Sequence, residues 1–76
     1  MKSINISLNS IDKVKSFVNI IASYAGDFDL ASDRYVVDAK SIMGIFSLDL
    51  AKPLRLDIHD ASVIDDLTAK LKSFIV

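Results

Sequence analysis

The 76-residue chain has no cysteine, which excludes disulfide bonds and thiolate metal sites. It has one histidine, His59, and a single imidazole without a second such ligand nearby does not make a metal site. Glutamate is also absent, so the ten acidic residues are all aspartate, and nine basic residues leave a net charge of −1. The lack of cysteine and of a second histidine leads us to expect no metal site. Because there is no excess of positive charge to neutralise phosphates, we also expect no direct nucleic-acid partner.

Long apolar runs are missing too, and no segment approaches the ~20 apolar residues that a membrane-spanning helix needs. The first residues lead directly into an alternating polar and apolar segment, which differs from the apolar block of a signal peptide. Hydrophobic residues nevertheless make up 51% of the chain and charged residues 25%, as in folded domains. We therefore expect one domain over residues 1–76, located in the cytoplasm, without membrane insertion.

Two hydrophobic periodicities divide the chain. An alternating or β-rich pattern predicts strands over residues 3–8, 27–31, 35–37 and 54–59. Helical spacing predicts helices over residues 11–25, 42–48 and 62–75. The order β-α-β-β-α-β-α, with right-handed crossovers, predicts the α+β class: an open-faced β-sandwich with a four-stranded antiparallel sheet and both long helices on one face. We expect the other face to be solvated, including Arg55, Asp57 and His59.

A serine lies at or just before the start of each predicted helix. Ser10 and Ser41 are suitable N-caps because a serine hydroxyl can accept a hydrogen bond from a free first-turn N–H. Asp12 falls in the first turn, where the helix dipole favours an acid. Ser62 and Asp65 have the spacing of a capping box for the last helix.

The short helix carries more apolar side chains than one thin core can accept. Ile42, Met43 and Phe46 cannot all point inward, and an exposed apolar cluster is typical of a contact surface. Ile20 lies outside the buried stripe of the first helix, which includes Ile11, and extends the same surface. The alternative is that these side chains simply close the core.

The run from Val37 to Leu48, V-D-A-K-S-I-M-G-I-F-S-L, resembles HPr, the histidine-containing phosphocarrier family of the sugar phosphotransferase system. Its K-S-I-M-G block spans residues 40–44, and the similarity continues without gaps to Ile58. The segments A-S-Y at residues 22–24 and F-D-L at residues 28–30 are similarly placed. The resemblance implies the HPr fold, whose element order is the one that the periodicity predicts.

One departure from the family concerns its chemistry. The phosphorylated histidine of HPr opens the first helix in a G-[IL]-H-A-R-P-A motif, where residues 8–14 here are L-N-S-I-D-K-V. Ser10 takes the place of the histidine, and Asp12 stands where an arginine would pair with the phosphoryl group. A serine phosphoester is too stable to pass the group onward, and Asp12 would repel it. We therefore expect no phosphocarrier activity, no catalytic residue and no cofactor.

Ser41 has two interpretations, since it can be a helix cap alone or also a regulatory site. The resemblance implies the second, because an ATP-dependent HPr kinase phosphorylates this serine in low-GC Gram-positive members of the family. It also implies that the short helix docks onto proteins such as enzyme I, HPr kinase and transcription regulators. Our leading hypothesis is a regulatory or protein-interaction module. The alternatives are residual phosphotransfer through Ser10 and a plain α/β binding domain with an idle inherited motif.

Overall fold

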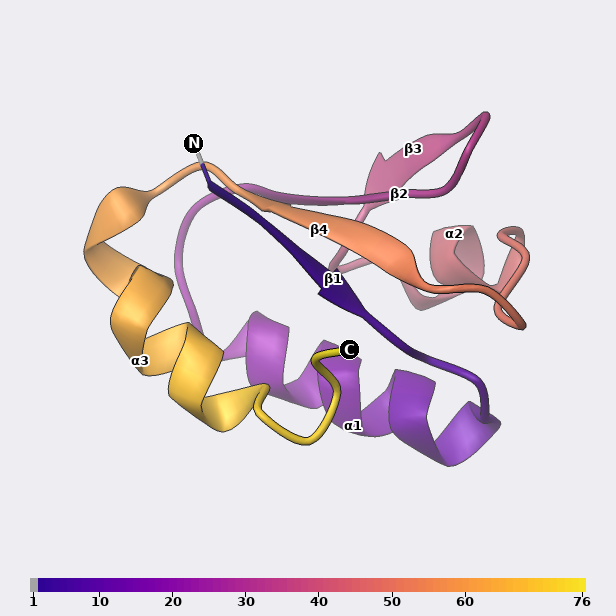
Figure 1. Ribbon diagram of the computed structural model, residues 1–76. Helices are drawn as coiled ribbons and strands as arrows, with labels where there is room; N and C mark the ends of the chain where they lie inside the picture. The colour runs from indigo at the N-terminus through magenta and orange to yellow at the C-terminus, as the bar shows by residue number, and fades with distance from the viewer. Residues whose placement is uncertain (1) are drawn as a thin grey trace.

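A computed structural model describes residues 2–76 (Figure 1). Its elements, in chain order, are β1 (Lys2–Ile6), α1 (Ile11–Ala22), β2 (Phe28–Ala31), β3 (Val36–Asp38), α2 (Ile42–Phe46), β4 (Leu54–Ile58), the 3₁₀ turn η1 (Ala61–Val63) and α3 (Ile64–Lys70). The predicted element order and the α+β class are confirmed. None of the helices in this described part of the chain is both long and apolar enough to cross a membrane.

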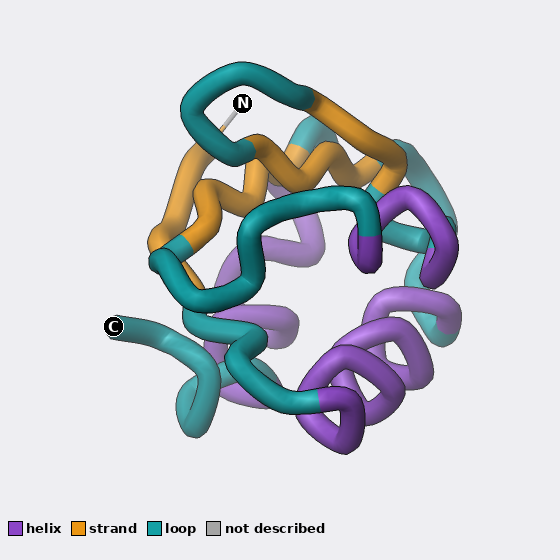
Figure 2. The backbone as a smooth tube through the Cα atoms, turned by 90° about the vertical axis from the view of Figure 1, so that its right-hand side faces the viewer, coloured by secondary structure: helices purple, strands orange, loops and turns teal. Residues whose placement is uncertain are grey.

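The four strands form one antiparallel sheet in the order β1-β4-β2-β3. Between the edge strand β1 and its neighbour β4, Ile6 lies opposite Leu54, and Lys2 lies opposite Ile58. Figure 1 shows α1 and α3 side by side beneath the sheet, as the crossovers predict. Figure 2 looks onto the end of the molecule where α2 and the loop after it lie.

The core fills the space between the sheet and the two long helices. Phe17 of α1 and Phe74, beyond α3, meet there edge to face, with 6.3 Å between their ring centroids. Fully buried side chains come from every layer, and they include Ile6, Leu8, Val14, Phe17, Ile21, Phe28, Leu30, Ile45, Leu54, Leu56, Ile58, Leu67 and Leu71. One hydrophobic cluster therefore closes the domain.

The helices α1 and α2 end at Ala22 and Phe46, earlier than predicted, and two expectations about helix starts are wrong. Ile11 is 62% exposed rather than part of the buried stripe, because it is the first residue of α1 and no earlier turn of the helix covers it. Ser62 does not cap the last helix, because the Asp60 carboxylate accepts from the Ser62 N–H and hydroxyl and begins a 3₁₀ turn instead. The helix α3 then starts at Ile64 without a side-chain cap.

The predicted last helix also ends early. The helix α3 stops at Lys70, and the following turns still bury Leu71 and Phe74, which explains the helical spacing in the sequence. Ile75 then forms an antiparallel bridge with Ile6, and the Val76 N–H donates to the Asn5 carbonyl at 3.1 Å. The chain end thus pairs with part of the β1 edge, which would otherwise present free backbone groups.

Candidate interaction site

The N-terminus of α1 is closed by Ser10. Its Oγ accepts a hydrogen bond from the Lys13 N–H at 3.2 Å, and its carbonyl accepts from the Val14 N–H at 3.1 Å. Asp12 occupies the first turn. The predicted cap is therefore confirmed, and the Ser10 hydroxyl already has a structural partner.

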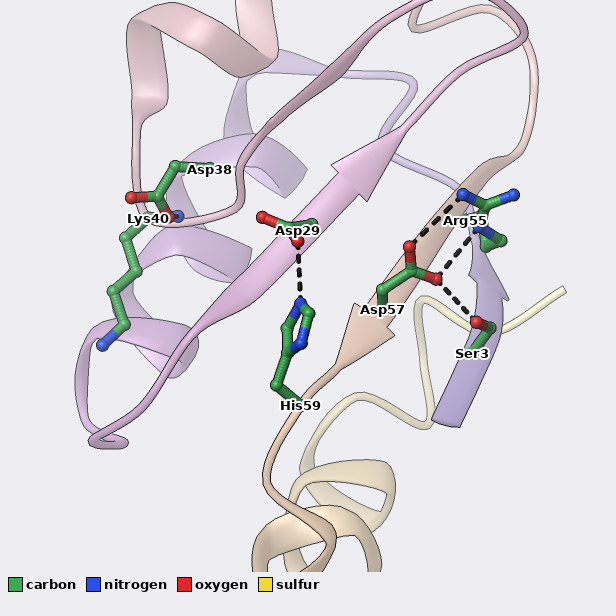
Figure 3. A network of polar contacts seen from close by, with 7 residues as sticks. All are labelled: Ser3, Asp29, Asp38, Lys40, Arg55, Asp57 and His59. Atoms are coloured by element: carbon green, nitrogen blue, oxygen red, sulfur yellow. Dashed lines mark hydrogen bonds and ion pairs between the residues drawn. The ribbon is translucent and has the colours of Figure 1, made fainter. Parts of the chain in front are cut away.

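His59 lies at the other end of the sheet from Ser10. Leu54, at the start of β4, pairs with Ile6 shortly before Ser10, whereas Ile58, at the end of β4, pairs with Lys2. His59 follows Ile58, and its Nε2 lies 2.7 Å from the Asp29 carboxylate on the open face of the sheet (Figure 3). The length of the strands therefore separates the only imidazole of the chain from the N-terminus of α1.

The helix α2 starts at Ser41, as predicted, and Gly44 explains how closely it packs. The Ser41 Oγ is exposed and accepts from the Gly44 N–H at 3.2 Å. A Cβ at position 44 would lie 3.2 Å from both the Ser41 Oγ and the Val37 Cβ. A side chain at position 44 would therefore push slightly against the cap or against β3, so glycine lets α2 lie closer to β3.

Lys40 fastens the segment before α2 to the end of α1. Its Nζ donates to the Tyr24 carbonyl at 2.8 Å and lies 5.6 Å from the centre of the Phe28 ring. Its backbone N–H donates to the Asp38 carboxylate at 2.9 Å. These contacts fix the direction in which the chain reaches Ser41. This role of the Lys40 side chain could not be predicted from the sequence, because its partners Tyr24 and Phe28 lie more than ten residues away from it in the chain.

Four apolar residues, Ile20, Ile42, Met43 and Phe46, form what we call the docking surface. Met43 is 76% exposed and Phe46 is 38% exposed, whereas Ile20 and Ile42 are half-buried against the core. Ile45 is fully buried and anchors α2, and the helices α1 and α2 are in contact. The predicted partial exposure is present, while the role of these residues stays a prediction.

The open face of the sheet contains a buried carboxylate, contrary to prediction. Asp57 is only 6% exposed and accepts from the Ser3 hydroxyl at 2.6 Å and from the Arg55 Nε at 3.0 Å (Figure 3). Burial raises the pKa of Asp57, but the hydrogen bonds from Ser3 and Arg55, with the Arg55 and His59 charges, outweigh it and leave that pKa below its ordinary value. Neighbouring strands shield this carboxylate, because Ser3 and Asp29 lie opposite it.

Comparison with solved structures decides the fold family. The chain aligns with HPr-C-His from Thermoanaerobacter tengcongensis at 24% identity and a TM-score of 0.73, over 96% of this chain and 93% of that one. It aligns with the phosphocarrier protein HPr from Bacillus anthracis str. Ames at 25% identity and a TM-score of 0.64, over 99% and 94% of the two chains. The chain has the HPr fold. No protein-family model and no curated protein sequence matches it.

The HPr fold confirms the resemblance drawn from the K-S-I-M-G block, including its element order. Within this HPr-like chain, Ser10 caps α1 and Asp12 lies in its first turn. A shared fold does not transfer a function, which depends on the residues at the site. The roles of Ser10, Asp12, Ser41 and the docking surface therefore enter as proposals.

Proposed function

We propose that this HPr-like chain is a cytoplasmic protein-interaction module related to the sugar phosphotransferase system, without phosphocarrier activity. It binds enzyme I-like, HPr kinase-like or transcription-regulator-like proteins through the docking surface. Phosphorylation of Ser41 regulates that binding. The observation that carries the proposal is an HPr fold with an exposed apolar α2 and a serine, already used as a cap, at the start of α1.

The absence of phosphocarrier activity follows from the groups at the start of α1. A phosphocarrier needs a nucleophile whose phosphoryl bond is labile, and an imidazole provides one. Ser10 offers only a hydroxyl, which accepts from the Lys13 N–H. Asp12 adds a negative charge in the first turn of the same helix. Its carboxylate and the phosphoryl group would both be negative, so Asp12 would repel an incoming phosphoryl group.

The docking role rests on the exposure of Met43 and Phe46. In a helix of five residues, Ile45 already fills the core position, and Met43, at 76% exposure, contributes little to burial in the monomer. Phe46 is more than half buried, but 38% of it stays exposed for contact with a partner. Large apolar and aromatic side chains that become buried in a complex can dominate its affinity. Methionine also adapts its shape to different partners.

Regulation through Ser41 is compatible with its place in the fold. The hydroxyl is exposed at the start of α2, and its oxygen already accepts a backbone hydrogen bond. A phosphate there would add negative charge and more acceptor oxygens, which the free N–H groups of a first helical turn favour. The modification would alter the charge beside Ile42 and Met43 without removing the cap.

Phosphorylation assays test both parts of the proposal by mass. We expect no phosphoadduct after incubation with phosphoenolpyruvate and enzyme I. We expect one phosphate after incubation with ATP and HPr kinase, which Ser41→Ala abolishes and Ser10→Ala retains. An acid-labile, base-stable adduct formed from phosphoenolpyruvate would overturn the claim that phosphocarrier activity is absent. A phosphate on Ser10 would favour residual phosphotransfer instead.

Binding titrations test the docking surface against enzyme I and HPr kinase. Replacing Met43 or Phe46 with alanine should weaken binding by about thirtyfold if the side chain is an interface anchor. Val36→Ala is a matched control, because Val36 is 62% exposed on β3, outside the docking surface. Equal affinity of all three variants for the partner would contradict the docking role of Met43 and Phe46.

A further inference from the structure

A hollow of about 290 Å³ lies between the turn that joins β2 to β3 and the connection from α2 to β4. Figure 2 shows these two loops one above the other at the end of the molecule that faces the viewer. Its lining residues are Ser32, Asp33, Arg34, Tyr35, Ser47, Asp49, Lys52, Pro53 and Leu54. Ligand pockets usually occupy roughly 300–1,000 Å³, and this loop pocket lies just below that range, so it has room only for a small ligand.

The charges of the loop pocket are balanced but not paired. Arg34 and Lys52 supply positive charge, and Asp33 and Asp49 supply negative charge. The ion pairs among residues 2–76 involve none of these four side chains. Asp49 Oδ1 accepts from the Ala51 N–H at 3.1 Å, which holds that carboxylate in its turn and leaves its second oxygen available. A complementary ligand carries both signs of charge and no net charge.

The other lining groups narrow the chemistry further. Tyr35 is 62% exposed, and with Pro53 it gives the pocket an apolar wall. The Ser47 hydroxyl donates to the Gly44 carbonyl at 2.6 Å, so toward a ligand its oxygen acts as an acceptor. An ammonium group, which carries only donors, matches such an acceptor.

We propose that the loop pocket binds a free amino acid with an apolar or aromatic side chain. Arg34 and Lys52 receive the carboxylate, with the Arg34 guanidinium suited to a bidentate contact. Asp33, Asp49 and the Ser47 oxygen receive the ammonium group. The side chain of the amino acid lies against the apolar wall at Tyr35.

This site is separate from the proposed docking surface but adjoins it. Ser47 follows Phe46 and is the C-cap of α2, so an occupant of the pocket touches the end of the docking helix. The register of β1 and β4 places Leu54 opposite Ile6, at the end of the sheet that leads to Ser10. Binding of an amino acid here does not depend on whether α2 docks a protein.

Titration of the full chain followed by NMR tests the proposal. L-leucine or L-tyrosine should cause saturable shifts in the amides of residues 32–35 and 47–54. N-acetyl-L-leucine removes the ammonium charge and L-leucinamide removes the carboxylate. Each should bind at least about tenfold more weakly, because each loses charge-assisted hydrogen bonds. D-glucose is an uncharged comparison that should cause no saturable shifts.

Variants locate the binding groups. Arg34→Gln and Asp49→Asn should each weaken leucine binding by about tenfold, and asparagine keeps an oxygen for the Ala51 N–H. Lys15→Gln on α1 and Asp65→Asn on α3 are matched controls that should bind as the parent does. Thermal unfolding of each variant confirms that it folds.

Three results would overturn the assignment: no saturable shifts with either amino acid, equal affinity for the blocked leucines, or the same shifts with D-glucose. The last would make the hollow a polyol site. These readouts do not depend on binding of enzyme I. A failure of the docking proposal, tested with Met43→Ala, can therefore be told apart from a failure of the amino-acid proposal.

Discussion

The two faces of the sheet are stabilised in different ways, although they belong to the same strands. On the covered face, Leu54, Leu56 and Ile58 of β4 are buried beneath the helices. On the open face, Asp57 of the same strand is also buried, but by neighbouring strands and within hydrogen bonds from Ser3 and Arg55. Hydrophobic burial is non-directional, whereas the polar cluster depends on the position of each partner. An alternating strand therefore need not have one solvated face.

The largest effect is expected on the covered face. Leu56→Ala should lower the free energy of unfolding by about 2–5 kcal/mol, because it leaves a cavity between the sheet and the helices. Leu56 is fully buried at the centre of β4. Urea denaturation followed by circular dichroism measures the change. A loss no greater than that of an open-face variant would contradict the difference between the faces.

A smaller effect is expected from the buried carboxylate. Asp57→Asn keeps the shape of the side chain but removes its charge, and hydrogen bonds to charged groups contribute about 1.5–3 kcal/mol. We expect a loss of stability within that range at neutral pH, measured by the same denaturation. Ser3→Ala removes one donor and serves as the matched variant, with a smaller loss.

The same substitution should change how stability depends on pH. The pKa of Asp57 is lowered by folding, so its contribution is fully present above the unfolded-state pKa of about 3.9 and is lost as the pH falls through the folded-state pKa. The difference in stability between the parent and Asp57→Asn should therefore shrink from about pH 6 to about pH 2. A constant difference would show that the charge of Asp57 contributes nothing.

The smallest effect is expected at Arg55. Its side chain is 54% exposed, so solvent screens its ion pair with Asp57. Arg55→Met should cost about 0.5–1 kcal/mol, compared with under about 0.5 kcal/mol for a solvated residue without partners. The check is the free energy of unfolding beside that of Lys15→Met, an exposed residue of α1. Equal losses in the two variants would show that the pair with Asp57 is not stabilising.

Parts of the candidate site could be predicted because they depend on residues close together in the chain. Ser10 and Ser41 each cap a helix through an N–H three residues later. The exposure of Met43 and Phe46 follows from a short helix with more apolar side chains than core positions. The K-S-I-M-G block indicated the HPr fold before any coordinates. The loop pocket could not be predicted, because its lining comes from two loops that are separate in sequence and are brought together only by the folded sheet.

The sequence by itself determined the element order, the two serine caps and the absence of histidine at the start of α1, because periodicity, capping and residue identity are local properties. Only the tertiary structure decided that Asp57 is buried beside Ser3 and that Lys40 reaches Tyr24. It also decided that Ile75, which the sequence predicts to be helical, pairs with Ile6 instead. These contacts join residues far apart in sequence, and their partners are set by strand register and packing, which no local pattern contains.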